Sequence, residues 1–211
     1  MPIDKKWVDF AKRMLNGIGY DYGQWARTVM YQECFKLVNE LGPHKLDALE
    51  ISAGYKWQKL GFRSFTETNY PAFDICKDKL DRTFDIIIAD QVWEHLLWPY
   101  RATGNVYDML PPGGYFLVTT PFMIRQHAVP VDCSRWTELG MKHFLAECGF
   151  PWDGIKTASW GNRRLRQGEL QALGAARLVR ILAQRAGLPG CGLGARPQGL
   201  HKAPYGAQTP Y

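Results

Sequence analysis

The sequence predicts an α/β fold in which a mostly parallel, doubly wound sheet has helices on both faces. Short apolar runs at 46–51, 84–90 and 115–121 alternate with segments of helical periodicity. This alternation is typical of βαβ units. The run 84–90 is almost continuous in β-branched residues, which indicates a strand buried on both faces. A helical cover is expected to precede the sheet and an irregular tail to follow it.

Two helices are predicted in the N-terminal cover, residues 1–45. Apolar residues recur at helical spacing from Trp7 to Leu15, after Asp4, a residue type that favours N-caps. A second apolar face covers 29–41 and ends at Gly42-Pro43, a strong helix stop.

The next segment, 46–162, is predicted to be the sheet domain. It begins with strands at 46–51 and 62–68, a short stretch before Asp74 that could be a third strand, and the buried strand 84–90. A helix at 93–109 and a turn at 111–114 lead into the strand 115–121. A helix at 137–148 and a short strand at 155–160 complete the domain.

The amino-acid composition excludes several classes of protein. With 46% hydrophobic and 13% aromatic residues in 211, a packed core is expected. No apolar run approaches the roughly 20 residues of a membrane span, and the first residues do not read as a signal peptide. The five scattered cysteines lack CxxC pairs, which favours reduced thiols in a cytoplasmic protein over disulfides or a zinc site. No internal repeat is evident, and the oligomeric state is left open.

The basic charge lies in the tail. Residues 1–162 carry 18 basic and 19 acidic side chains, a net of −1, whereas residues 163–211 carry 8 basic and one acidic, a net of +7. The near-neutral body therefore makes nucleic acid an unexpected partner, although a basic protein normally suggests one. All eight tryptophans also precede residue 162.

The tail, 163–211, is rich in Gly, Ala, Arg and Pro, and the sequence suggests no further apolar strand in it. One interpretation is a shift of reading frame near codon 163, because a one-base shift of permitted codons yields a charged loop and an apolar strand. The alternative is a natural Arg-rich tail with one helix near 169–186.

Chemistry is expected at the carboxyl ends of the strands, where open α/β sheets bind their ligands. Small and acidic residues stand at those ends: Glu50, Ser52, Ala53 and Gly54 after the first strand, Glu67 and Asn69 after the second, Asp74 and Ile75 after the possible third, and Asp90, Gln91, Glu94 and His95 after the fourth.

Three stretches in order resemble class I S-adenosylmethionine-dependent methyltransferases of the small-molecule type 11/12-like branch. Residues 49–54 look like their acidic, glycine-rich first motif, 84–96 like their fourth strand, and 110–121 like their Leu-x-Pro-Gly-Gly strand. Residues 135–137 and 147–150 look like the helix that follows. The resemblance covers about 46–161 and implies a Rossmann-like fold with S-adenosylmethionine as cofactor.

The resemblance implies roles for the residues of the first turn. Glu50 would orient the amino end of the methionine moiety, and Ser52, Ala53 and Gly54 would let the turn approach the cofactor. Ser52 replaces the usual first glycine; a serine is tolerated there if its φ is negative, and its hydroxyl could bond the cofactor carboxylate. The alternative for Glu50 is a carboxylate that only caps the next helix.

The remaining cofactor contacts are implied in the same way. The ribose acid could be Glu67 or Asn69, with Glu67 preferred for its charge. Asp74 would meet the adenine amino group with Ile75 against the ring, unless Asp74 is only a turn residue.

After the fourth strand, Asp90, Gln91 and Glu94 are expected in the cofactor region. The neighbouring Trp93 is equally well read as a core residue.

A general base is expected beside the acceptor. His127 with Asp132, in the loop after the strand 115–121, could deprotonate an acceptor, and His95 is the competing candidate. His95 could also be a locally bonded residue at a helix start. No cluster with ligand spacing along the chain predicts a metal.

The function predicted is transfer of a methyl group from S-adenosylmethionine to a small-molecule or glycan-type acceptor. The alternatives are a nucleic-acid methyltransferase or binding protein that uses the basic tail, and an inactive methyltransferase-like protein.

Overall fold

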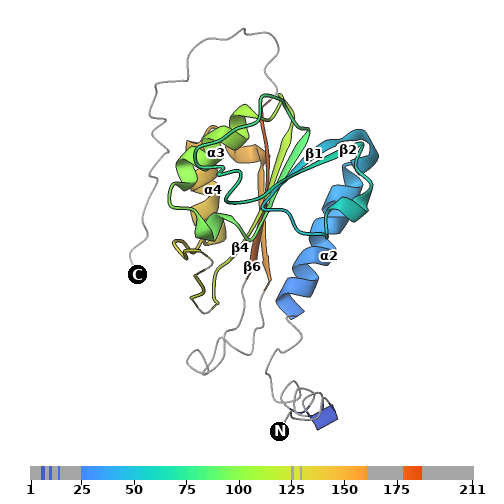
Figure 1. Ribbon diagram of the computed structural model, residues 1–211, viewed down its shortest axis with the longest axis vertical. Coiled ribbons are helices and arrows are strands. Elements are labelled where there is room, and N and C mark those ends of the chain that lie inside the picture. Colours follow the sequence, from blue (N-terminus) through green and yellow to red (C-terminus); the bar gives the residue numbers. More distant parts are fainter. Residues whose placement is uncertain are drawn as a thin grey trace.

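A computed structural model gives the structure of the chain and describes residues 6, 7, 10, 14, 25–124, 126–128, 130–160 and 178–186. Their strands form one six-stranded sheet in the order β2-β1-β3-β4-β6-β5 (Figure 1). The strands are β1 (Asp47–Ile51), β2 (Ser64–Thr68), β3 (Ile86–Asp90), β4 (Tyr115–Pro121), β5 (Ile155–Trp160) and β6 (Leu178–Gln184).

The sheet is mostly parallel and doubly wound, as predicted. β1 pairs in parallel with β2 on one side and β3 on the other, and β3 pairs in parallel with β4. Only β6 runs antiparallel, between β4 and β5. The chain reverses its direction of winding after β2, so β1 and β3 meet at a switch point.

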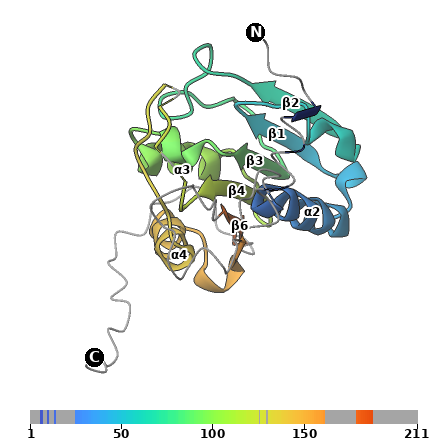
Figure 2. The ribbon, with the colours of Figure 1, turned by 90° about the horizontal axis from the view of Figure 1, so that it is seen from below.

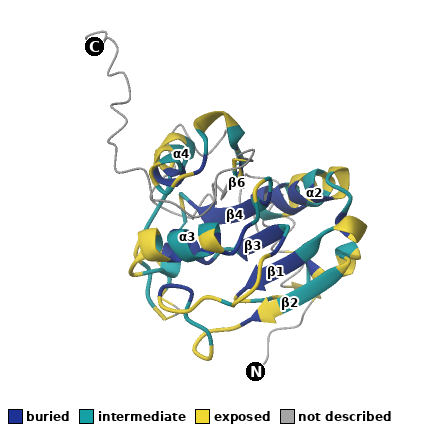
Figure 3. Ribbon diagram, turned by 90° about the horizontal axis from the view of Figure 1, so that it is seen from above, coloured by how far each residue is buried: buried dark blue, intermediate teal, exposed yellow. Residues whose placement is uncertain are grey.

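Helices cover both faces of the sheet, which confirms the predicted layers. α2 (Trp25–Glu40) lies on one face, and α3 (Pro99–Asp108) and α4 (Glu138–Glu147) lie on the other (Figure 2). β3 serves both cores by alternation: Ile86 and Ile88 pack with the buried residues of α2, whereas Ile87 packs on the α3 and α4 side. The middle strands are consequently the most buried part of the fold (Figure 3).

Two predicted elements differ from the structure. The helix expected over 93–109 begins only at Pro99, after a 3-10 turn at Trp93–His95, because proline disfavours helical backbone in the residue before it. The possible third strand before Asp74 is not formed, since no strand lies between β2 and β3. Asp74 instead closes a turn by accepting a hydrogen bond from the Cys76 backbone N–H at 3.0 Å.

The expectation of a tail without a further strand is wrong. β6 continues the sheet, and its Ile181 and Ala183 are fully buried between β4 and β5. The run Leu-Val-Arg-Ile-Leu-Ala-Gln suits helix or strand equally by composition, and tertiary pairing decides for the strand. The described part of the alternative helix at 169–186 is therefore extended as well. The proposed shift of reading frame stays a prediction. The absence of a further strand in the tail no longer supports it, because β6 is present.

The cover and the rest of the tail lie largely outside the described residues. Within the first predicted helix, residues 6, 7, 10 and 14 are helical, and its other residues lie outside the described part of the chain. Residues 161–177 and 187–211 of the tail are also outside. Among the described residues, no helix is long and apolar enough to cross a membrane.

Candidate functional site

Acidic side chains meet where β1, β2 and β3 end. Glu50 is paired in register with Glu67 on β2 and with Ile88 on β3. Since Ile88 packs on the α2 face, the alternation along each strand turns Glu50, Glu67 and Asp90 to that same face. The sheet thus brings together three of the acids that the sequence assigned to the cofactor.

Glu50 is 2% exposed and holds the first turn. Its Oε1 accepts a hydrogen bond from the Gly54 backbone N–H at 2.9 Å, whereas its buried Oε2 has no hydrogen-bond partner in the described structure. Burial raises its pKa to about 7, and the negative charges of Asp90 and Glu67 add to that effect. Glu50 therefore caps the turn and still has one oxygen left for a ligand.

The turn after β1 departs from the expectation for Ser52. Its φ is 56°, in the left-handed region, so the negative φ under which a serine is easily tolerated is not met. The turn requires that backbone, which explains why glycine is usual at this position in the family that the sequence resembles. The turn is also tied to β2, because the Ala53 N–H donates to the Thr68 carbonyl at 3.1 Å.

The other predicted cofactor residues differ in how accessible they are to a ligand. Glu67 and Asn69 are both exposed at the end of β2, and Glu67 is the one beside Glu50. Asp74 binds Lys77 at 3.0 Å and the Cys76 backbone, so its carboxylate is used within its own turn. Ile75 is 3% exposed and packs into the core.

Asp90 has partners on both oxygens. Thr119 donates to Oδ1 at 2.6 Å, and the Tyr31 hydroxyl donates to Oδ2 at 2.6 Å, with the Trp57 indole N–H at 3.4 Å. Gln91, with a φ of 59°, binds the Thr119 hydroxyl through Nε2 at 3.1 Å. Asp90 therefore ties β3 to α2 and to β4 at this edge.

The sequence did not identify the cations near this edge. The ammonium of Lys56 lies 3.9 Å from the centre of the Tyr31 ring, and the guanidinium of Arg27 lies 6.0 Å from it. Lys56 also acts electrostatically on Glu50 and Asp90. Its place two residues after Gly54 was the one available signal, whereas Arg27 and Tyr31 come from the distant α2.

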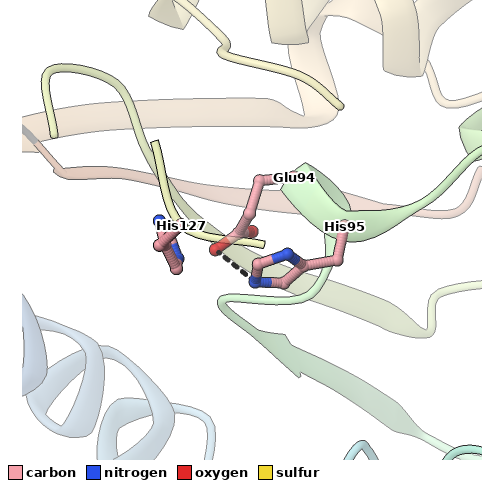
Figure 4. A group of neighbouring side chains, drawn as sticks. All are labelled: Glu94, His95 and His127. Atoms are coloured by element: carbon pink, nitrogen blue, oxygen red, sulfur yellow. Dashed lines mark ion pairs between the residues drawn. The ribbon is translucent and has the colours of Figure 1, made fainter. Parts of the chain in front are cut away.

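A second group joins η3 (Trp93–His95) to the loop after β4. One ligand atom from each of Glu94, His95 and His127 lies within 4.8 Å of the others (Figure 4). His95 Nε2 is 3.7 Å from Glu94 Oε1, and the two histidine rings are 5.1 Å apart. Sequence spacing gave no sign of this group, because His127 is brought in by the fold.

The predicted pairing of His127 with Asp132 is looser than a hydrogen bond. His127 Nδ1 is 3.7 Å from Asp132 Oδ2, an oxygen that accepts from the His127 backbone N–H at 2.8 Å. Arg135 forms a two-pronged ion pair with Asp132, and it holds the pKa of that carboxyl well below its usual range. Asp132 is thus an anchor of the loop, while His127 and His95 remain side by side.

Solved structures that match this fold include methyltransferases. Haemonchus contortus phosphoethanolamine N-methyltransferase 2 matches with a TM-score of 0.54 at 14% identity, over 74% of this chain and 53% of its own length. This chain therefore spans about half of that enzyme. Burkholderia thailandensis 1,6-didemethyltoxoflavin-N1-methyltransferase matches with a TM-score of 0.54 at 14% identity. The match covers 88% of this chain and 92% of that enzyme. A Mesorhizobium loti S-adenosylmethionine-dependent methyltransferase matches with a TM-score of 0.50 at 15% identity. The match covers 71% of this chain and 96% of that enzyme.

The chain has the Rossmann-like α/β fold of class I methyltransferases, and the resemblance seen in the sequence is confirmed at the level of the fold. No family model and no curated protein matches the sequence.

Proposed function

We propose that the chain binds S-adenosylmethionine at the carboxyl ends of β1 and β3 and transfers its methyl group to a small-molecule acceptor. The observation that carries this is the buried Glu50 carboxylate, which closes the first turn with one oxygen and keeps the other unpartnered at the switch point. A ligand with an ammonium group satisfies such an oxygen, and the methionine moiety carries one.

Three further features support this cofactor. Glu67 stands beside Glu50 at the end of β2, where its exposed carboxylate can accept hydrogen bonds from ribose hydroxyls. Lys56 and Arg27, close to Tyr31, supply positive charge for the cofactor carboxylate. The solved Haemonchus and Burkholderia structures contain S-adenosylmethionine or S-adenosylhomocysteine.

Asp74 and Ile75 remain candidates for the adenine. Both are already committed in the structure, Asp74 to its turn and Ile75 to the core. We therefore place more weight on Glu67 than on Asp74 as a cofactor ligand.

The acceptor enters on the side of His95 and His127. In the transfer, a lone pair of the acceptor forms the new bond to the methyl carbon, the sulfur–methyl bond breaks, and its electron pair stays on sulfur. An acceptor proton passes to a base, for which His127 and His95 are the candidates. Positioning of the two reactants supplies much of the acceleration, so the edge that holds the cofactor matters as much as the base.

A small-molecule or glycan-type acceptor fits better than a nucleic acid. The body of the chain is near neutral, and at least one charge of the basic tail is used internally. The Arg185 guanidinium donates to the Tyr107 carbonyl at 2.9 Å and lies over the Tyr107 ring. The Haemonchus and Burkholderia enzymes are themselves named for small-molecule acceptors.

Release of S-adenosylhomocysteine tests the proposal. The chain is incubated with S-adenosylmethionine and a panel of small amines, phenols, carboxylates and sugars, and with RNA as a comparison. We expect acceptor-dependent release with a member of the small-molecule panel, weakened in Glu67→Gln and unchanged in the exposed α2 variant Glu40→Gln. Release with RNA alone would favour the nucleic-acid alternative, and release with none of them would contradict the enzymatic proposal.

A further inference from the structure

We propose that Glu94, His95 and His127 bind one divalent transition-metal ion beside the cofactor edge, with a coordination position left for an oxygen of the acceptor. One ligand atom from each residue lies within 4.8 Å of the others (Figure 4). In a tetrahedral zinc site, bonds of about 2.1 Å place ligand atoms roughly 3.4 Å apart. Modest side-chain movement therefore completes the site.

Glu94 is the strongest evidence for a cation. Its side chain is fully buried, and neither carboxylate oxygen has a hydrogen-bond partner in the described structure. A buried carboxylate is costly unless a proton, a cation or a metal compensates it. The nearest histidine nitrogen, His95 Nε2, lies 3.7 Å from Glu94 Oε1. That distance is too long for a hydrogen bond, but the nitrogen faces the carboxylate.

Arg135 does not supply that compensation by contact. Both of its terminal nitrogens bind Asp132, so its charge reaches Glu94 only through space.

His95 is already held in the form that binds metals. Its Nδ1 lies 2.6 Å from the Val131 carbonyl oxygen, which can only accept a hydrogen bond. Nδ1 therefore carries the proton, and the lone pair of the neutral ring falls on Nε2, the atom that faces Glu94. Metal-binding histidines commonly donate their other N–H to a backbone carbonyl in this way.

The loop that carries His127 is anchored independently. Asp132 accepts from the His127 backbone N–H and is itself held by Arg135. The Cys133 and Ser134 N–H groups donate to the Glu94 carbonyl at 2.7 and 3.1 Å, which joins the loop to η3. The third ligand is thus positioned relative to the other two by contacts other than the metal.

Two imidazoles and one carboxylate favour a transition metal such as Zn²⁺ or Co²⁺ over Mg²⁺, which prefers oxygen ligands. Three protein ligands leave an open position, as in catalytic metal sites. The choice of an oxygen acceptor for that position rests on the proposed function, whereas binding of the ion does not. With the ion bound, the histidine lone pairs are used, and the ion instead of a histidine base would promote loss of the acceptor proton.

The test is titration of the full chain, stripped with a chelator, with Zn²⁺, Co²⁺ and Mg²⁺ by calorimetry. We expect one Zn²⁺ or Co²⁺ per chain and a rise in melting temperature, with much weaker Mg²⁺ binding. Glu94→Gln and His127→Ala should each weaken Zn²⁺ binding roughly tenfold or more. His44→Ala, which removes an exposed histidine from η1 (Pro43–Lys45), should leave it unchanged.

Unfolding curves of each variant establish that it is folded before titration. Zn²⁺ binding that is absent, or equally strong in Glu94→Gln, His127→Ala and the wild type, would overturn the metal proposal. A parallel titration with S-adenosylmethionine separates the two proposals. Binding of the cofactor without binding of a metal would contradict only the metal site. Binding of Zn²⁺ without binding of the cofactor would contradict only the proposed function.

Discussion

Glu50→Gln is expected to stabilise the protein at alkaline pH while it weakens binding of the cofactor. The glutamine keeps an oxygen for the Gly54 N–H but carries no charge into the buried turn. The wild-type carboxyl has a pKa of about 7, against an ordinary 4.5, because of burial. The folded state therefore holds its proton more tightly than the unfolded state does.

The sign follows from that difference. Between about pH 4.5 and 7 the folded wild type binds more protons, so this group lowers the stability of the wild type as the pH rises. The shift corresponds to roughly 3 kcal/mol once the carboxyl is ionised in both states. Since part of this is already present at pH 5, the stability of the variant relative to wild type should rise by about 2 kcal/mol between pH 5 and 8.

Urea unfolding at pH 5, 6, 7 and 8 measures this difference, and S-adenosylmethionine titration on the same samples measures affinity. Glu40→Gln, which changes an exposed glutamate at the end of α2, is the matched control and should show little pH-dependent gain. A stability difference between Glu50→Gln and wild type that does not vary with pH would refute the reasoning.

Three further substitutions probe the fold around the site by thermal unfolding. Ser52→Gly relieves a left-handed φ and should stabilise by about 1 kcal/mol, and a loss of stability would contradict the strained turn. Thr103→Val removes the acceptor of the buried Trp93 indole N–H, at 3.0 Å, and should cost about 1–3 kcal/mol, whereas a neutral effect would argue against that bond. Ile181→Ala should cost about 2–5 kcal/mol because Ile181 is fully buried in β6; no cost would mean that this strand does not pair as described.

Strands buried on both faces were the most predictable part of the fold. The β-branched run of β3 and the apolar run of β4 leave little choice of structure, since helix propensity and periodicity are both weak there. β6 was missed because its residues lie among Ala, Gly and Arg and have no clear period. Only pairing with β4 and β5 decides its conformation.

The location of the candidate residues was predictable where topology determines it, and their role in binding stays a prediction. Glu50 and Asp90 follow from the rule that ligands bind beyond the carboxyl ends of the strands. The partners of Asp90 did not follow, since Tyr31 is 59 residues away and Trp57 is 33 residues away. The positive φ of Ser52 was also missed, because a serine by itself gives no sign of it.

The fold also changes how the nucleic-acid alternative must be tested. Deletion of 163–211 would remove β6 from between β4 and β5 and leave β5 without its partner strand, so a loss of RNA binding could come from damage to the fold. A shortened chain whose last residue is Ala186 keeps β6. Its RNA binding is the proper comparison with that of the full chain.

Calorimetric titration of the folded full chain with S-adenosylmethionine tests the central claim most directly. The account predicts saturable binding of one molecule per chain, competed by S-adenosylhomocysteine and weakened in Glu67→Gln. A folded sample that gives no heat of binding and no shift in melting temperature would contradict the cofactor site at β1 and β3.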